Sequence, residues 1–280
     1  MSESRALRSP SLPTSALRVF DLSLGEMLWS RRTIFMALIV GAPVAIAVVF
    51  RALELFGMSS MRVNGARVSG PTIFGILIWF LYVKFIVPIL GVFYGTALMA
   101  DEVEDKTITY LFTRPISRGA VLLGKYLAYL ACTLFVVLPS VVLVFFLIVP
   151  IGGGSIAGAF MSLIRDLMLL GLGLIVYGAV FAFVGGRLKR PLVVGLVFAF
   201  GWEQTVLLIP GYLKRLTVAY YLQALVPHAM PQDGVVSLLQ SVFRETPSAA
   251  ASVAWLAAMW AVFLWRATRA VERREYVLEQ

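Results

Sequence analysis

Long runs of apolar residues, separated by short polar segments, dominate this chain. Six such runs cover residues 34–50, 73–100, 121–149, 167–184, 192–209 and 249–265. A helix needs about 20 apolar residues to cross the hydrocarbon core of a bilayer, and each run approaches or exceeds that length. The pattern therefore predicts an all-α integral membrane protein with six transmembrane helices, in a domain spanning residues 34–265.

The segments that flank these runs carry a weaker helical pattern. Within residues 1–33, apolar residues recur at helical spacing, and the charged residues lie at other positions. The apolar residues are Leu17, Phe20, Leu24, Met27 and Leu28. This predicts a helix lying in the membrane interface, although a polar start of the first span would fit the same residues. Leu213, Leu216 and Tyr220 predict a second interfacial helix before the last span. Residues 266–280 are expected to form a C-terminal tail.

Composition and charge agree with a membrane protein. The 280 residues are 60% hydrophobic and 14% charged, whereas soluble domains average about 45–50% and about 25%. The net charge of +9 would also suit a nucleic-acid-binding protein, but the basic residues flank apolar runs, which favours the membrane and excludes nucleic acid as a partner.

The distribution of basic residues predicts the orientation in the membrane. Sixteen of the 24 Lys and Arg residues fall in the two terminal segments and in the segments after the second and fourth runs, and seven fall in the opposite segments. Because cytoplasmic loops are enriched in Lys and Arg, we expect a multi-pass protein of the plasma (inner) membrane with both termini cytoplasmic.

The sequence contains few residues that could form a metal site or a catalytic site. Cys132 and His228 are the single residues of their types, which excludes an intrachain disulfide and leaves little for a histidine metal site or a catalytic triad. No G-x-x-x-x-G-K-[ST] phosphate-binding loop occurs in the chain. We therefore expect no cofactor bound by this chain and no enzymatic activity of its own.

The most distinctive polar segment is residues 100–125, between the second and third runs. Its acidic residues would favour the N-terminal turn of a short helix, Pro115 would end that helix, and Ser117 would cap the next one. The charge pattern alone is equally typical of a solvated turn.

The residue order of this segment resembles the permeases of type-2 ATP-binding-cassette (ABC) transporters. The resemblance rests on the acidic patch from Glu102 to Thr107, on R-P-I-S-R at residues 114–118, and on G-K at residues 124–125. It implies an N-terminal interfacial (elbow) helix, short external helices before the last span, and a cytoplasmic coupling helix between spans 2 and 3. The residues expected to couple to the ATPase are Asp101, Glu102, Glu104, Lys106, Thr107, Ile108, Leu111, Phe112, Arg114, Pro115 and Arg118.

The resemblance also implies partners and a function. The chain would be the permease subunit of an exporter, paired with a second permease copy, identical or paralogous, and with membrane lipids around it. A separate cytoplasmic ATPase would bind ATP and Mg²⁺. The sequence does not select a substrate.

Two ionisable residues lie inside predicted spans. Lys84 and Glu203 are at similar estimated depths, so we hypothesise an intramembrane pair, because such residues often mark a functional path. The alternative is that Lys84 extends to the headgroups and Glu203 has a purely structural partner.

Two other function classes remain open from the residues alone. One is a secondary transporter or channel that works without an ATPase, although paired inverted repeats are not evident. The other is an intramembrane enzyme, for which the chain lacks an H-E-x-x-H motif and a pair of aspartates within its spans.

Overall fold

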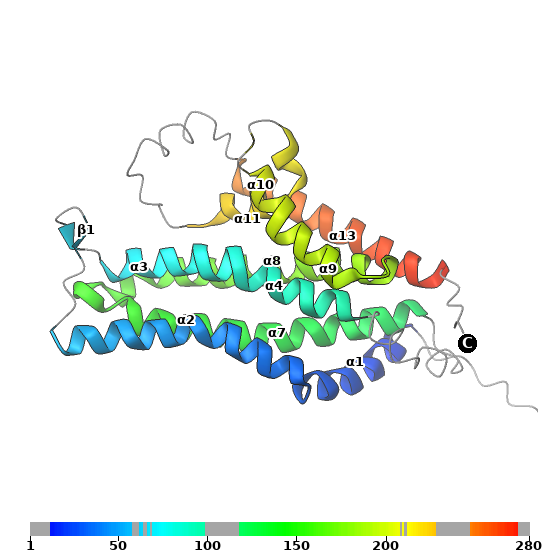
Figure 1. The fold of residues 1–280 in the computed structure, drawn as a ribbon, viewed down its shortest axis with the longest axis horizontal. Helices are drawn as coiled ribbons and strands as arrows, with labels where there is room; N and C mark the ends of the chain where they lie inside the picture. The colour runs from blue at the N-terminus through cyan, green and yellow to red at the C-terminus, as the bar shows by residue number, and fades with distance from the viewer. Residues whose placement is uncertain are drawn as a thin grey trace, which may run out of the picture.

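The computed structural model describes residues 12–57, 62–63, 66–67, 69–98, 118–207, 209, 212–227 and 247–273. Within them the regular secondary structure is helical except for one two-residue antiparallel ladder, in which Arg62 faces Arg67. The elements shown in Figure 1 are α1 (Leu12–Leu28), α2 (Arg31–Leu55), β1 (Arg62–Val63), β2 (Ala66–Arg67), α3 (Gly70–Leu77), η1 (Ile78–Ile86), α4 (Val87–Leu90), η2 (Gly91–Gly95), α7 (Arg118–Ile148), η3 (Ile151–Gly153), α8 (Ile156–Arg187), α9 (Pro191–Leu196), η4 (Val197–Trp202), α10 (Glu203–Val206), η5 (Tyr212–Leu216), α11 (Val218–Leu225) and α13 (Ala249–Arg273).

Five helical runs of the described residues are long and apolar enough to cross a membrane. They are Thr33–Leu55, Gly70–Leu98, Arg118–Ile148, Ile156–Arg187 and Ala249–Glu272. The all-α membrane fold class is thereby confirmed. The predicted fifth span coincides with a shorter apolar helix, Pro191–Val206, whose 16 residues reach about 24 Å at 1.5 Å per residue. The count of six spans therefore stays a prediction.

Helix α8 begins at Ile156, well before the apolar run that predicted it at residue 167. Ser155 sets this start, because its hydroxyl accepts a hydrogen bond from the Gly158 N–H at 3.2 Å, as an N-cap residue does. Its 32 residues give a length of about 48 Å, which exceeds a hydrocarbon core of about 30 Å.

Close backbone approaches join α8 to the second span. Gly91 and Gly95, in η2, pack on Tyr177 and Phe181 of α8, where a Cβ on either glycine would lie 2.7 or 2.8 Å from a side-chain Cβ. Membrane helices lack a hydrophobic driving force between them and associate through such small-residue contacts. The G-x-x-x-G spacing in η2 therefore holds these two spans together.

Tyrosine hydroxyls join α7 to α8 as well. Tyr126 donates to the Ile175 carbonyl at 2.7 Å and Tyr129 donates to the Leu174 carbonyl at 2.9 Å. Trp260 of α13 in turn donates its indole N–H to the Tyr126 hydroxyl at 3.1 Å. Because a buried hydroxyl in an apolar medium needs a partner, these bonds fix the relative positions of the three helices.

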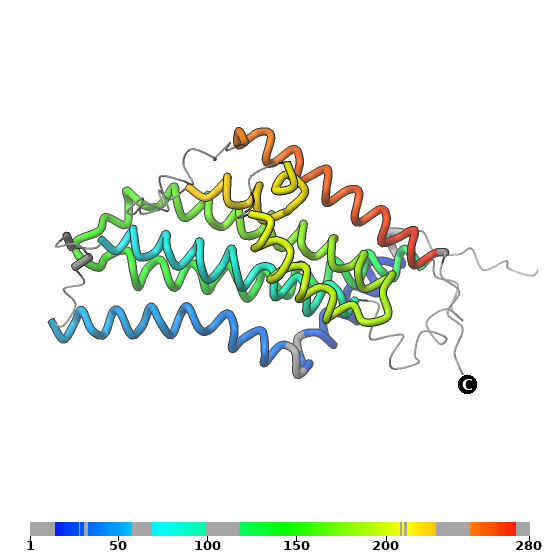
Figure 2. The backbone as a smooth tube through the Cα atoms, turned by 45° about the horizontal axis from the view of Figure 1, so that its top comes forward, coloured from blue at the N-terminus to red at the C-terminus, as the bar shows by residue number. Residues whose placement is uncertain are grey.

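One end of the bundle gathers elements that are distant in sequence. Helix α1, the start of α7 and the end of α13 lie at the same end, and the β1–β2 ladder lies at the other (Figures 1 and 2). Helix α1 packs so closely on α7 that a Cβ on Gly124 would lie 2.6 Å from the Ala16 carbonyl oxygen. A Cβ on Gly119 would lie 3.0 Å from a carboxyl oxygen of Glu272. The first turns of α7 are thus contacted by both ends of the described chain.

Three stretches of the described residues, η1, η2 and η4, have the wider turns of a π-helix, in which residues five apart lie over each other. In η1 this spacing places the Lys84 amine 4.1 Å from the centre of the Trp79 ring, and the Phe80 and Phe85 rings 5.2 Å apart. Pro88 follows at once, and it has no N–H to donate to the Lys84 carbonyl. The π-helix η1 ends at Ile86, two residues before this proline.

Candidate functional site

The predicted coupling segment lies almost entirely outside the described residues. Of its members only Arg118 is described, as the half-buried first residue of α7. The second span ends, and α7 begins, at the end of the bundle that holds α1 and the C-terminal turns of α13 (Figures 1 and 2). The roles assigned to residues 101–118 stay predictions.

The clearest polar site within the described membrane domain surrounds Glu203. This residue begins α10 and is fully buried. One carboxyl oxygen accepts a hydrogen bond from the Tyr177 hydroxyl of α8, and the other accepts from the Val218 N–H at 2.9 Å. Val218 is the first residue of α11, so the carboxyl group of Glu203 caps a helix that follows it in the chain.

The position of α11 along the bundle makes this cap unusual. Leu222 of α11 lies against Gly173, because a Cβ there would be 3.3 Å from a Leu222 methyl carbon. Gly173 lies about 21 Å along α8 from Arg187, the last residue of that helix. Helix α11 therefore lies well inside the bundle, where a helix N-terminus has no water to satisfy its N–H groups. Glu203 supplies the acceptor that water would otherwise provide.

Lys84 and Glu203 have different partners in this structure. Lys84 is half-buried with its amine over the Trp79 ring, and Glu203 is bonded to Tyr177 and Val218. Their helices do meet, since the Phe85 ring of η1 lies 5.8 Å from the Phe200 ring of η4. The hypothesised pairing of the two ionisable groups stays a prediction.

Sequence reasoning did not find Tyr177, Val218 or Trp79 as partners of these residues. The signal for Trp79 was present, because it precedes Lys84 by the five residues that a π-helix brings together. Tyr177 and Val218 are brought to Glu203 by tertiary packing between separate elements, which no local pattern shows.

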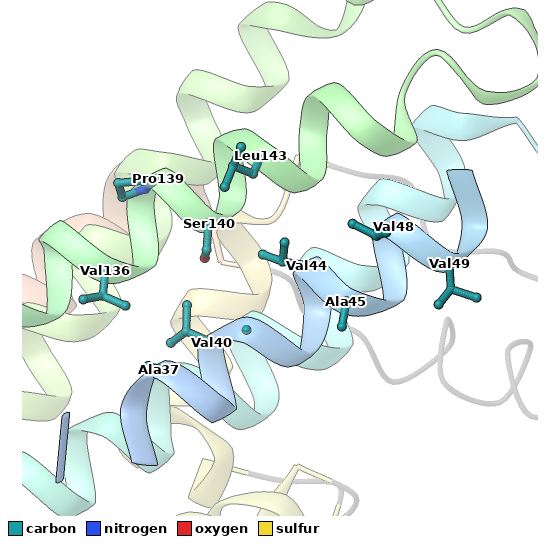
Figure 3. A pocket seen from close by; sticks show the side chains of 11 residues that line it. Ala37, Val40, Val44, Ala45, Val48, Val49, Val136, Pro139, Ser140 and Leu143 are labelled. Carbon is teal, nitrogen blue, oxygen red and sulfur yellow. The ribbon is translucent and has the colours of Figure 1, made fainter. Parts of the chain in front are cut away.

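A groove of about 670 Å³ lies between α2 and α7 (Figure 3). Its lining is almost wholly apolar and comprises Ala37, Val40, Gly41, Val44, Ala45, Val48, Val49, Val136, Pro139, Ser140 and Leu143. The one hydroxyl, that of Ser140, is 3.0 Å from the Tyr82 hydroxyl and donates to the Val137 carbonyl at 2.7 Å. The groove can accommodate apolar groups but offers no reactive side chain.

The described residues contain no set of three His, Cys, Asp or Glu side chains placed to hold a metal ion. Glu203, Tyr126 and Tyr129 are polar groups that instead join helices to one another. The described part of the molecule thus has the features of a membrane scaffold with polar contacts between its spans.

Comparison with known families identifies a match over nearly the whole chain. The family model described as "ABC-2 family transporter protein" matches residues 27–275. A comparison with curated protein sequences gives no match. The family match includes every described span and the segment between the second and third of them.

Proposed function

The chain belongs to the ABC-2 family of transporter proteins, and on that premise we propose that it is the membrane permease subunit of an exporter driven by a separate ATPase. The observation that carries the proposal is the family match over residues 27–275 of a multi-pass helical chain. The absence of a phosphate-binding loop from the sequence supports an ATPase on another polypeptide. Two permease copies, identical or paralogous, and two ATPases would form the pump.

The proposed coupling element is the segment 101–118. Its described neighbours support this role, because Gly119 contacts Glu272 of α13 and Gly124 contacts α1. A displacement of the segment would therefore reach α1, α7 and α13 together. In this proposal ATP and Mg²⁺ bind the partner ATPase, and the conformational change of the ATPase is transmitted to the permease through this segment.

Co-purification tests the proposed partnership. An affinity-tagged chain, extracted in mild detergent from its own cells, is expected to recover a polypeptide that contains a phosphate-binding loop. Recovery of the folded chain without any ATPase would favour the other open class, a secondary transporter or channel. Subunit stoichiometry by mass photometry would then report whether two permeases are present.

We propose that both termini and the coupling segment face the cytoplasm, because basic residues concentrate there. Cysteine labelling checks this orientation. With Cys132 replaced by alanine, a cysteine in place of Thr113 is expected to resist an impermeant maleimide in intact cells and to react after the cells are opened. A cysteine in place of Asn64 is the matched control and is expected to react in intact cells. Reversed labelling would contradict the orientation.

A further inference from the structure

A second pocket, of about 430 Å³, lies between the last turns of α8 and α13. Its lining combines aromatic and basic side chains with two small residues, and comprises Phe183, Gly186, Arg187, Trp265, Arg266, Arg269 and Ala270. Three guanidinium groups from two helices thus border one cavity. The apolar groove between α2 and α7 carries no comparable charge.

Two of the three guanidinium groups rest on aromatic rings of their own helix. The Arg269 guanidinium carbon lies 5.0 Å from the centre of the Trp265 ring, and that of Arg187 lies 6.0 Å from the centre of the Phe183 ring. Each pair is spaced i, i+4, so the aromatic ring and the arginine lie on the same helix face. Such cation–π contacts hold the guanidinium groups in place while leaving their N–H groups able to bind a further partner.

No described carboxylate forms an ion pair with these three arginines. The Arg51–Glu54 pair belongs to the end of α2, and Glu272 lies beside Gly119 of α7. The pocket therefore combines three positive charges without a counter-charge from the described residues. An arginine fork binds phosphate oxygens through two parallel hydrogen bonds, which makes a phosphate group a fitting ligand.

The pocket lies where two apolar spans end. The spans run to Arg187 and Glu272, and the Trp265 side chain is 56% exposed. Tryptophan at the end of a span is typical of the headgroup level of a bilayer. Val262, one turn before Arg266, is 49% exposed, so an apolar surface continues from the pocket toward the hydrocarbon core. A ligand with both a phosphate and acyl chains matches this arrangement, in which a basic pocket adjoins an apolar surface.

We propose that the pocket between α8 and α13 binds the headgroup of an anionic phospholipid. Arg187, Arg266 and Arg269 hold the phosphate, and Trp265 packs against the glycerol and the upper part of the chains. A basic pocket between membrane helices is a recognised arrangement for such headgroups. The proposal depends on the membrane placement of the two spans and not on the proposed ATPase.

The test measures lipid binding to the full-length chain in detergent by native mass spectrometry. Phosphatidylglycerol is titrated against phosphatidylcholine of the same acyl chains, and the wild-type chain is expected to prefer phosphatidylglycerol. The double variant Arg266→Gln/Arg269→Gln is expected to lose about 25-fold in phosphatidylglycerol affinity, because each basic residue near an anionic lipid contributes roughly a factor of five.

A charge-matched control separates the pocket from the general surface charge. Lys189→Gln/Arg190→Gln also removes two positive charges, from exposed positions just after α8 that do not line the pocket. It is expected to change phosphatidylglycerol affinity less than about threefold. Equal losses in the two double variants, or equal binding of the two lipids by the wild type, would overturn the proposal.

Two further arms complete the test. Inorganic phosphate is added at millimolar concentration, and continued binding of phosphatidylglycerol is expected; full displacement would show a site for free phosphate and overturn the lipid assignment.

Arg269→Lys keeps the charge and is used should the double glutamine variant not fold. Lysine lacks the planar fork, so this variant is expected to lose about threefold in affinity, and unchanged affinity would contradict a guanidinium-specific site.

Discussion

Replacing Leu111 with aspartate is expected to leave the membrane domain inserted and folded but to abolish recovery of the partner ATPase. Ile108, Leu111 and Phe112 are spaced to form an apolar ridge on the predicted coupling helix. A few buried anchors supply most of the binding energy of an interface, and loss of one costs about 2 kcal/mol or more. That corresponds to at least about 30-fold weaker association.

The measurement is the amount of ATPase that co-purifies with the variant chain, together with ATP hydrolysis by the isolated complex. Leu55→Asp provides the matched control, because Leu55 ends α2 and is 74% exposed at the opposite end of the bundle. Glu102→Lys is expected to weaken recovery as well, because it reverses a charge on the proposed docking face. Wild-type ATPase recovery and hydrolysis in both Leu111→Asp and Glu102→Lys would remove the coupling assignment.

Replacing Glu203 with alanine is expected to remove most of the folded protein. The change leaves the Tyr177 hydroxyl and the Val218 N–H without their acceptor, and each buried unpaired donor costs about 1–3 kcal/mol. A total of several kcal/mol is a large part of a stability of about 5–15 kcal/mol. Thermal unfolding in detergent, followed by size-exclusion chromatography, measures the loss.

Two variants make this result specific. In Glu203→Gln the amide can still accept from Val218 and donate to the Tyr177 oxygen, so most of the folded protein is expected to remain. Tyr177→Phe combined with Glu203→Ala removes one of the two unpaired donors and is expected to recover part of the stability. Glu54→Ala, at a partly exposed carboxylate, should cost less than about 1 kcal/mol. Equal stability of Glu203→Ala and Glu54→Ala would contradict the capping role.

The apolar pattern predicted the spans because hydrophobicity and length decide them. The predicted run 73–100 corresponds to Gly70–Leu98, and the run 249–265 lies within Ala249–Glu272. The early start of α8 escaped notice because Arg165 and Asp166 interrupt its apolar run, while the cap that begins the helix depends on the single hydroxyl of Ser155.

The candidate site was predicted less completely than the spans. Glu203 attracted attention as an acidic residue in an apolar run, but its role as a cap depends on α11 returning into the bundle. That return places Leu222 of α11 against Gly173 of α8. The local sequence of neither helix predicts this contact. The predicted interfacial helix before the last span is present instead as the short helices η5 and α11.

The contact between α1 and Gly124 has a mechanical consequence. Since no side chain separates the Ala16 carbonyl from the α7 backbone, α1 cannot slide along α7 without breaking a close-packed joint, and packed interiors transmit strain with little compression. The two helices therefore move as one rigid unit where α7 begins. If the proposed coupling segment moves the start of α7, α1 is expected to move with it.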